Sequence, residues 1–445
     1  MNLDWLSLLM FVAVLGFLSL GYPVAFSLGG VALFFTLIGM ALGVFDPILW
    51  SAMPQQIFGT MNNFTLLAIP YFIFLGSMLE QSGIAENLLE TMGILFGRLR
   101  GGLAIAVIIV GALLAATTGV VAATVISMGL ISLPTMLRYN YNKQLATGVI
   151  VASGTLGQII PPSVVLVVLG DQLGISVGDL FMGSFIPGLL MTGVFLIHVL
   201  VIAWIRPDVA PALPQEVLEA PGLAGRVIKV LIPPLLLILL ILGSIFFGIA
   251  TPTEAGAVGC VGAIILAIAN RKLTLETLSK VCDVTLRTTC MVMFILIGSR
   301  AFSLVFRGLG GDDLVRESLL NIPGDQFGFL FVTMALVFVL GFFIDFFEIV
   351  FIVVPLLVPI AQDFAMDLVW FGVVLGANLQ TSFLTPPFGF ALFYLRGVAP
   401  AEVSTEDIYK GAIPFITLQL IVLLLLIIFP QIVSFLPSLS QGINI

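Results

Sequence analysis

The chain has 445 residues, of which 60% are hydrophobic and only 9% are charged. A soluble globular protein needs more polar surface than this composition supplies, so the composition excludes that class. The net charge of −8 lies in short loops, and no basic tract indicates a nucleic-acid partner. Apolar runs of about twenty residues without alternation exclude a β-barrel, which leaves an all-α polytopic protein of the lipid bilayer.

Apolar runs predict the membrane spans. In chain order, the predicted spans are residues 5–21, 24–43, 63–82, 144–171, 178–205, 230–248, 252–270, 284–306, 367–397 and 411–437. The first run has no basic flank and no small-residue cleavage site, so we expect a retained span rather than a signal peptide. Adjacent prolines, Pro161-Pro162 and Pro386-Pro387, interrupt 144–171 and 367–397. Because proline removes a backbone donor, both spans are predicted to be discontinuous helices.

Two further apolar stretches, 101–137 and 327–362, are too long for one crossing and are interrupted near the middle. The interruptions are "TTG" at 117–119 and "GFFIDFFE" at 341–348. Each stretch is either two crossings or one re-entrant hairpin, and both alternatives return the chain to the side it came from. A hairpin tip buried in protein tolerates polar residues better than a lipid-exposed pair of spans, so we expect two hairpins.

Flanking charges predict the side from which each hairpin enters. Basic residues bracket the first hairpin, which should therefore open from the cytoplasm: Arg98, Arg100, Arg138 and Lys143. Acidic residues bracket the second hairpin, which should open from the opposite side: Asp312, Asp313, Asp325, Asp363 and Asp367. In this topology both termini lie outside the cytoplasm.

The two halves of the chain repeat each other. "FIFLGS" at 72–77 recurs as "FILIGS" at 294–299, and the two proline pairs recur at nearly the same offset. We therefore expect one repeat at 1–229, with hairpin 101–137 and broken helix 144–171, and a second at 230–445, with hairpin 327–362 and broken helix 367–397. An odd number of full crossings in each half makes the repeats inverted. Inverted repeats with broken helices are typical of secondary transporters, whose sites lie at the midplane.

A polar run precedes each proline pair, "ASGTLGQ" at 152–158 and "NLQTS" at 378–382. Unwound carbonyls and small hydroxyls supply the oxygen ligands that Na⁺ needs, so each break predicts a sodium site. The first site is predicted to contain Thr117, Thr118, Ser153, Gly154, Thr155 and Gly157. The second is predicted to contain Asn378, Gln380, Thr381, Ser382 and Thr385. The alternative is that the prolines only kink two helices, but two kinks at matching repeat positions do not favour it.

Three charged residues are candidates for substrate contact, because charge inside a membrane is costly. Asp345 and Glu348 lie in the second hairpin tip, where a solvated tip is the alternative. Arg300 lies late in span 284–306, where snorkelling to the interface is the alternative. The sequence contains no nucleophile–base pair, no metal cluster and no Gly-rich phosphate loop, so we expect neither an enzyme nor ATP-driven transport. No covalent cofactor is expected, and Na⁺ is the predicted coupling ion.

The chain resembles the large membrane subunit of tripartite ATP-independent periplasmic (TRAP) transporters. The resemblance rests on an ordered set of motifs along nearly the whole chain: "NNFTLLAIPYFIFLGSMLE" at 62–80, "ASGTLGQIIPPS" at 152–163, "GIATPTEAGAVG" at 248–259, "VVPLLVPIA" at 353–361 and "LTPPFG" at 384–389. It implies sodium-driven uptake of a small carboxylate across a bacterial inner membrane by an elevator motion. It also implies two partners, a periplasmic substrate-binding protein and a small four-helix membrane subunit.

The first hairpin tip departs from the pattern of this family. Many members carry a Ser-Gly-Ser-Ser type tip, whereas this chain has "ATTGVVAAT" at 116–124. Val120 and Val121 offer no hydroxyl, so we expect the first sodium site to use mainly the carbonyls of 153–157. A stand-alone ion-coupled carboxylate or cation carrier is the alternative function. Such a carrier would share the inverted repeats but need no binding protein.

Overall fold

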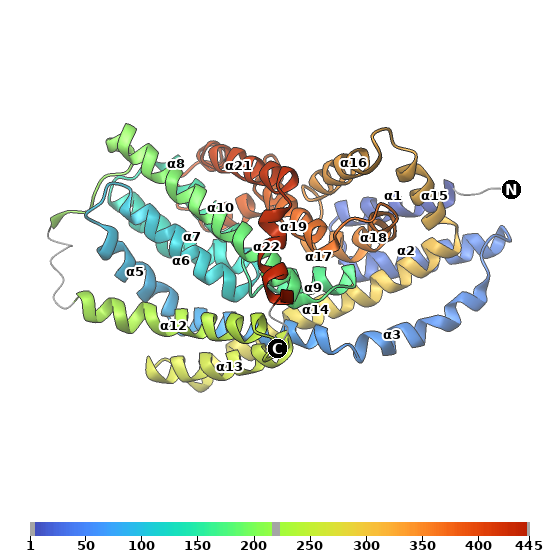
Figure 1. The fold of residues 1–445 in the computed structure, drawn as a ribbon, viewed down its shortest axis with the longest axis horizontal. Helices are drawn as coiled ribbons and strands as arrows, with labels where there is room; N and C mark the ends of the chain where they lie inside the picture. Colours follow the sequence, from blue (N-terminus) through green and yellow to red (C-terminus); the bar gives the residue numbers. More distant parts are fainter. Residues whose placement is uncertain (1–4, 216–222, 443–445) are drawn as a thin grey trace.

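The computed structural model of the chain describes residues 5–215 and 223–442, which form helices and their connections and contain no strand (Figure 1). The first half contains α1 (Trp5–Ser19), α2 (Val24–Ala41), η1 (Pro47–Ala52), α3 (Met53–Met61), η2 (Phe64–Leu67), α4 (Ala68–Gln81), α5 (Ile84–Phe96), α6 (Gly102–Thr118), α7 (Val121–Arg138), α8 (Lys143–Thr155), η3 (Leu156–Gln158), α9 (Val164–Leu173), α10 (Val177–Ile205) and η4 (Pro207–Val209). The second half contains α12 (Leu223–Phe246), α13 (Pro252–Ala269), α14 (Leu275–Gly308), α15 (Gly311–Leu320), α16 (Asp325–Leu340), α17 (Phe346–Ile352), α18 (Val354–Asp363), α19 (Leu368–Leu384), α20 (Phe390–Val398), α21 (Thr405–Ile428) and α22 (Gln431–Gly442).

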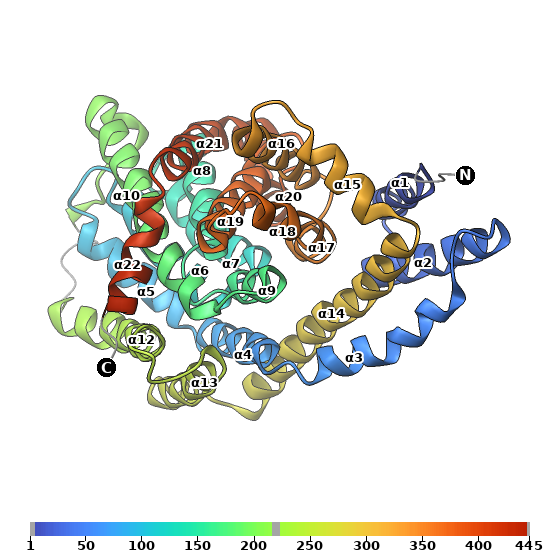
Figure 2. The same cartoon turned by 45° about the vertical axis from the view of Figure 1, so that its right-hand side comes forward.

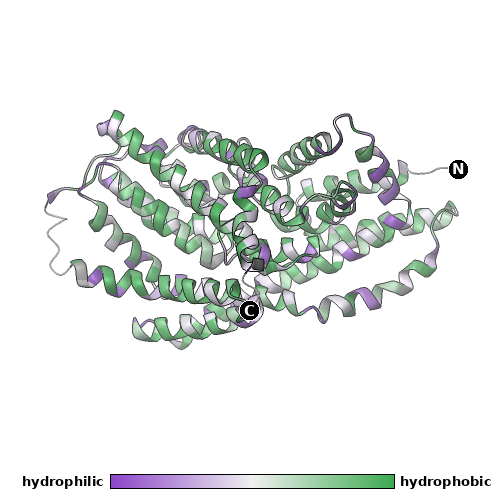
Figure 3. Cartoon of the chain, in the orientation of Figure 1, coloured by the Kyte–Doolittle hydropathy of each residue, from purple (hydrophilic) through white to green (hydrophobic). Residues whose placement is uncertain are grey.

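Membrane-length apolar helices dominate the described residues. By length and composition, 8 of them are able to cross a bilayer: α2, η2 continued by α4, α7, α10, α12, α13, α14 and α21. Apolar residues cover most helices, while hydrophilic residues gather mainly in connections and near helix ends (Figure 3). Such exposed apolar faces require a lipid environment, because their exposure to water is unfavourable in free energy. The fold is therefore all-α and polytopic, as the composition predicts.

Both interrupted apolar stretches fold as helical hairpins. In the first, α6 ends at Thr118 and α7 begins at Val121, and the reversal uses Gly119 with a φ of 60°. A positive φ is cheap for glycine because it has no Cβ. In the second, α16 ends at Leu340 and α17 begins at Phe346. A bend of 51° then separates α17 from α18.

The two proline pairs break their helices where the sequence predicts. The first span consists of α8, the short η3 turn and α9, with the peptide bond Pro161-Pro162 in the connection. The second span consists of α19 and α20, with Pro386-Pro387 in the connection. Both of these peptide bonds are cis. Since proline has no N–H, the carbonyl four residues before each proline has no helical hydrogen-bond donor.

Several elements differ from the predicted spans. The stretch 411–437 is not one span, because α21 ends at Ile428 and α22 starts after Pro430, which cannot donate a helical hydrogen bond. The predicted span 284–306 begins earlier, at Leu275, and forms a single helix of 34 residues. Three short helices, α3, α5 and α15, lie in stretches that were predicted as connections. They are too short and too polar to appear as membrane spans in the sequence.

The hairpins and broken helices of the two halves pack into one bundle. Helices α8, α19 and α21 pack together, with α6 and α7 on one side and α16 to α18 on the other (Figures 1 and 2). Helix α9 of the first half packs against α17 and α18 of the second, and α20 of the second half packs against α7 of the first. The order of elements recurs in the two halves. The division into inverted repeats stays a prediction, and its boundary after residue 229 falls within α12.

Candidate functional site

The first break lies in the interior of the bundle. Ser153, Thr155 and Ser163 are fully buried, and each hydroxyl donates a hydrogen bond to a nearby carbonyl. Ser163 Oγ lies 2.6 Å from the carbonyl oxygen of Gly157, so this bond spans the break itself. A hydroxyl that donates its hydrogen keeps oxygen lone pairs for another partner. Ser153 and Thr155, which the sequence predicts for this site, and Ser163, which it does not, therefore present hydroxyl oxygens to the buried interior.

The tip of the first hairpin packs directly on this break. A Cβ added at Gly157 would lie 2.6 Å from the carbonyl oxygen of Ala115, near the end of α6. A Cβ added at Gly119 would lie 2.7 Å from the backbone nitrogen of Val164, the first residue of α9. Only glycine fits at either contact, since real Cβ atoms do not approach so closely. The structure thus brings together the hairpin tip and the break.

The remaining residues predicted for the first site also lie here. Gly154 packs against α7, where an added Cβ would lie 2.4 Å from Val125 Cγ2. Thr117 and Thr118 form the last turn of α6, but their side chains lie outside the described residues. Ion binding at this site stays a prediction.

The second break is tied to its hairpin by polar bonds. Asn378 Nδ2 donates to the carbonyl of Met334 at 2.8 Å, and Ser382 Oγ donates to that of Phe338 at 2.6 Å. Both carbonyls belong to α16, the first arm of the second hairpin. Side-chain bonds between helices fix their register inside a membrane. The structure thus also brings together the second break and its hairpin.

Two further threonines line the end of α19. The Thr381 hydroxyl donates to the carbonyl of Ala377 and the Thr385 hydroxyl to that of Thr381, each at 2.8 Å. Thr381 is fully buried, whereas Thr385 is half-buried at the C-cap. All the residues predicted for the second site therefore lie within the last turns of α19 or at its end.

Three glutamines leave buried amide atoms without a partner among the described residues. They are Oε1 of Gln158, both amide atoms of Gln380 and Oε1 of Gln419. These side chains are at most 1% exposed. A buried polar atom without a partner costs about 1–3 kcal/mol, so such atoms indicate a place for water or an ion. Gln158 and Gln380 lie on the two broken helices.

Gln419 is a site residue that the sequence prediction missed. It lies on α21, and its Nε2 is 3.4 Å from Thr155 Oγ1 at the first break. The signal was present in the sequence, because Gln419 is the one amide in the apolar run "FITLQLIVLLLLII". Buried polar residues in such runs are expensive and are functional candidates. The contact itself joins residues 264 positions apart, so spacing alone does not reveal it.

The acidic pair in the second hairpin has a clear local role. Asp345 is the N-cap of α17, and Glu348 completes a capping box in which Asp345 N donates to Glu348 Oε2 at 3.1 Å. Such a box satisfies otherwise orphaned amides at a helix start. Glu348 is only 8% exposed, so a solvated tip does not describe this residue. Substrate contact by either carboxyl group stays a prediction.

Arg300 lies apart from the residues at the breaks. It is half-buried on α14 and lines a pocket of about 220 Å³ together with Gln56, Thr60 and Asn63. Asn63 also donates a hydrogen bond to Asp171 Oδ1 at the end of the first broken span. Of the other predicted site residues whose side chains the structure describes, none lines this pocket. A substrate contact and a snorkelling role for Arg300 both remain open predictions.

Comparisons with known proteins point to one family. The family model described as "Tripartite ATP-independent periplasmic transporter, DctM component" matches residues 11–432. The chain is 31% identical to the C4-dicarboxylate TRAP transporter large permease protein DctM of Vibrio cholerae, over 98% of each chain. It is 30% identical to the sialic acid TRAP transporter large permease protein SiaM of the same species, over 96% of this chain and 97% of that one. The solved structure of the Alcanivorax borkumensis YdaH transporter shares the fold, with a TM-score of 0.58 and 13% identity over 86% of this chain and 88% of that one.

Proposed function

The chain belongs to the DctM component family of tripartite ATP-independent periplasmic transporters, and from this premise we propose that it imports a small organic carboxylate together with Na⁺. As a TRAP large permease it is a transporter subunit and not an enzyme, and it is a multi-pass protein of the bacterial inner membrane. One observation carries the proposal: each proline break adjoins fully buried hydroxyl groups, Ser153 and Thr155 at the first and Thr381 and Ser382 at the second, and each broken helix packs on a hairpin.

Sodium suits these two breaks chemically. Na⁺ is a hard cation that prefers carbonyl and hydroxyl oxygens, as Mg²⁺ and Ca²⁺ do. At the first break we propose ligands among Thr117, Thr118, Ser153, Gly154, Thr155 and Gly157, and at the second among Asn378, Gln380, Thr381, Ser382 and Thr385. The hydroxyl hydrogens at the breaks already point to helix carbonyls, which leaves oxygen lone pairs for a cation. A bound ion would offset the cost of these buried oxygens.

The carboxylate substrate needs positive potential in the same region. Helices α9 and α20 both begin directly after a break, at Val164 and Phe390. Helix N-termini carry partial positive charge and unpaired N–H groups, which attract anions. We propose that these two helix starts face the substrate between the sodium sites. This arrangement requires no charged side chain at the breaks.

An elevator motion would carry both breaks as one body. Because α9 packs against the second hairpin and α20 against the first, the two breaks cannot separate without disrupting both contacts. We propose that α6 to α9 and α16 to α21 move together against α1 to α4 and α12 to α14. Polar contacts across this boundary would have to break, among them those of Ser127 with Glu80 and of Asn63 with Asp171.

We further propose that the substrate arrives on a periplasmic binding protein and that a small four-helix membrane subunit completes the carrier. Uptake in proteoliposomes tests the whole proposal. Transport of an organic acid that stabilises the binding protein should require both that protein and an inward Na⁺ gradient. A proton gradient alone should not replace the Na⁺ gradient. Full uptake with Na⁺ replaced by K⁺ would contradict sodium coupling. Equal uptake without the binding protein would instead indicate a stand-alone carrier.

A further inference from the structure

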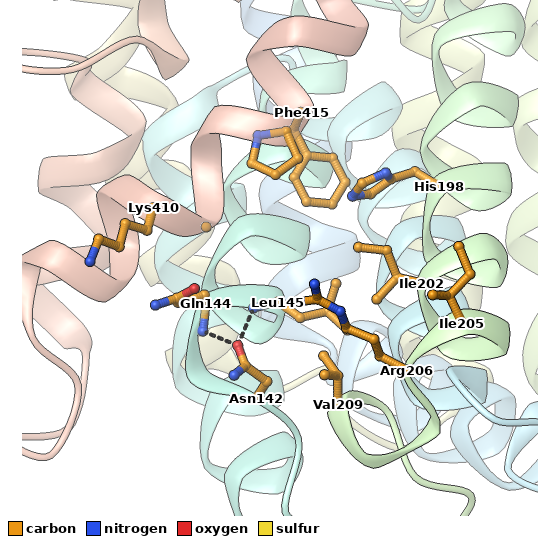
Figure 4. Close-up of a pocket in the computed structure, with 12 residues that line it drawn as sticks. Asn142, Gln144, Leu145, His198, Ile202, Ile205, Arg206, Val209, Lys410 and Phe415 are labelled. Carbon is orange, nitrogen blue, oxygen red and sulfur yellow. Dashed lines mark hydrogen bonds between the residues drawn. The ribbon is translucent and has the colours of Figure 1, made fainter.

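An open groove of about 440 Å³ lies between the start of α8, the end of α10 and the start of α21 (Figure 4). It is distinct from the two breaks, because none of the residues predicted for the sodium sites lines it. Much of its surface is apolar, with Leu145, Ile202 and Phe415 among the lining side chains. The groove therefore has mostly apolar walls and lies near the ends of three helices.

The charge of the groove is positive. Arg206 extends into the space beside Leu145, and it forms no ion pair with any residue in the described ranges (Figure 4). Lys410 lies across the groove, and its ammonium pairs with Glu406 at 2.6 Å. His198 packs on Phe415 with ring centroids 5.1 Å apart, and its Nε2 has no partner in the part of the chain described. Among the residues that the structure describes, no carboxylate lines the groove. Arg206 is thus the cation without an ion-pair partner among the described residues that line the groove.

The residues around Arg206 mark a membrane interface. It follows directly on α10, whose last residues, Trp204 and Ile205, are 83% and 63% exposed. An exposed tryptophan next to an arginine at the end of a long apolar helix is the pattern of the headgroup region. Arg100 and Lys143 flank the nearby hairpin and predict the cytoplasmic side. The phosphate groups of anionic phospholipids in the cytoplasmic leaflet therefore lie at the same depth as the groove.

We propose that this groove binds the phosphodiester headgroup of an anionic phospholipid. The Arg206 guanidinium pairs with the phosphate oxygens, for which its planar donors are well matched. The lipid chains lie along Ile202 and Ile205, and the apolar walls favour a lipid over a free inorganic anion. Because α8 forms one wall, the lipid contacts the first half of a broken helix at its outer end.

Native mass spectrometry of the detergent-solubilised protein tests this proposal. The protein is titrated with phosphatidylglycerol or phosphatidylcholine, with and without millimolar inorganic phosphate. We expect phosphatidylglycerol to bind preferentially, and Arg206→Gln to weaken that binding roughly fivefold, the equivalent of about 1 kcal/mol for one basic residue. Arg100→Gln is the matched control, since Arg100 is exposed on the same predicted side but does not line the groove. This control should bind both lipids as the unaltered protein does.

The Arg206→Lys variant and the competition with inorganic phosphate test the charge pairing and the identity of the ligand. Arg206→Lys keeps the charge and should retain the lipid preference, and both variants should elute as the unaltered protein does in size exclusion. Equal loss of the preference in Arg206→Lys and Arg206→Gln would overturn the charge pairing. Release of the lipid by inorganic phosphate would identify a free-anion site and overturn the lipid assignment. Equal binding of the two lipids by the unaltered protein would overturn the proposal outright.

Discussion

Replacing Thr385 by valine tests the second sodium site with little change in shape. The Thr385 hydroxyl donates to the carbonyl of Thr381 at 2.8 Å, and the residue is half-buried. Thr192 in α10 is a closely matched control, because it is also half-buried and its hydroxyl donates to the carbonyl of Gly188 at 2.9 Å. Both substitutions remove one hydroxyl bonded to the carbonyl four residues earlier. A difference in the Na⁺ dependence of uptake between the two variants therefore reflects the sodium site rather than the lost helix hydrogen bond.

The two variants should differ in sodium dependence and not in stability. Losing one neutral hydrogen bond costs about 0.5–1.5 kcal/mol in either variant, so their thermal unfolding should be similar. An ion that loses a buried ligand should bind more weakly by about 1–3 kcal/mol, by analogy with an unmade buried polar contact. This corresponds to a roughly 5- to 150-fold rise in the Na⁺ concentration for half-maximal uptake. If Thr385→Val kept its Na⁺ dependence, or if Thr192→Val lost as much, sodium would not bind at the α19 break.

Three further outcomes are expected. Gly157→Ala should lower thermal stability by about 1–3 kcal/mol and abolish uptake, because its Cβ would lie 2.6 Å from the Ala115 carbonyl oxygen near the hairpin tip. Gly193→Ala is the control and should do neither, because nothing lies within 4 Å of a Cβ at that position. Equal behaviour of the two variants would refute the close packing. Gln419→Leu should raise the Na⁺ concentration for half-maximal uptake with little change in thermal stability, because it removes an unpaired buried amide oxygen together with one long hydrogen bond to Thr155. An unchanged Na⁺ requirement would exclude Gln419 from the site. In a cysteine-free background, Leu99→Cys should be labelled only from the cytoplasm and Phe327→Cys only from outside; labelling of both from one side would contradict the inverted repeats.

The parts of the fold that the sequence predicts are those with strong local signals. Pro161-Pro162 and Pro386-Pro387 remove backbone donors wherever they occur, so both breaks are visible without tertiary information. The hairpins follow from length, since 101–137 and 327–362 exceed one crossing and carry polar residues at their middles. The capping box at the second tip was also present in the sequence, as an Asp followed three residues later by Glu.

Long-range contacts account for what the sequence does not show. Gln419 meets Thr155 only because α21 packs along α8, and Asn378 meets Met334 only because α16 lies against α19. Neither contact leaves a periodic pattern. The short helices α3, α5 and α15 are also invisible, because hydropathy detects membrane-length segments and these are 9, 13 and 10 residues long. Their place between spans is decided by tertiary packing.

The two hairpins are held against their broken helices by partly different contacts. At the first break, close packing fixes the hairpin, since Gly157 and Gly119 leave no room for a Cβ against the opposite backbone. At the second break, Asn378 and Ser382 bond to α16 carbonyls, and a glycine also packs closely, since a Cβ added at Gly341 would lie 2.5 Å from Ser382 Oγ. The tips "ATTGVVAAT" and "GFFIDFFE" differ in sequence, but each contains a glycine, Gly119 or Gly341, at the close contact with its broken helix. The valines that follow Gly119 at the first tip therefore do not prevent the tip from packing on the break, because the close contacts are made by Ala115 and Gly119.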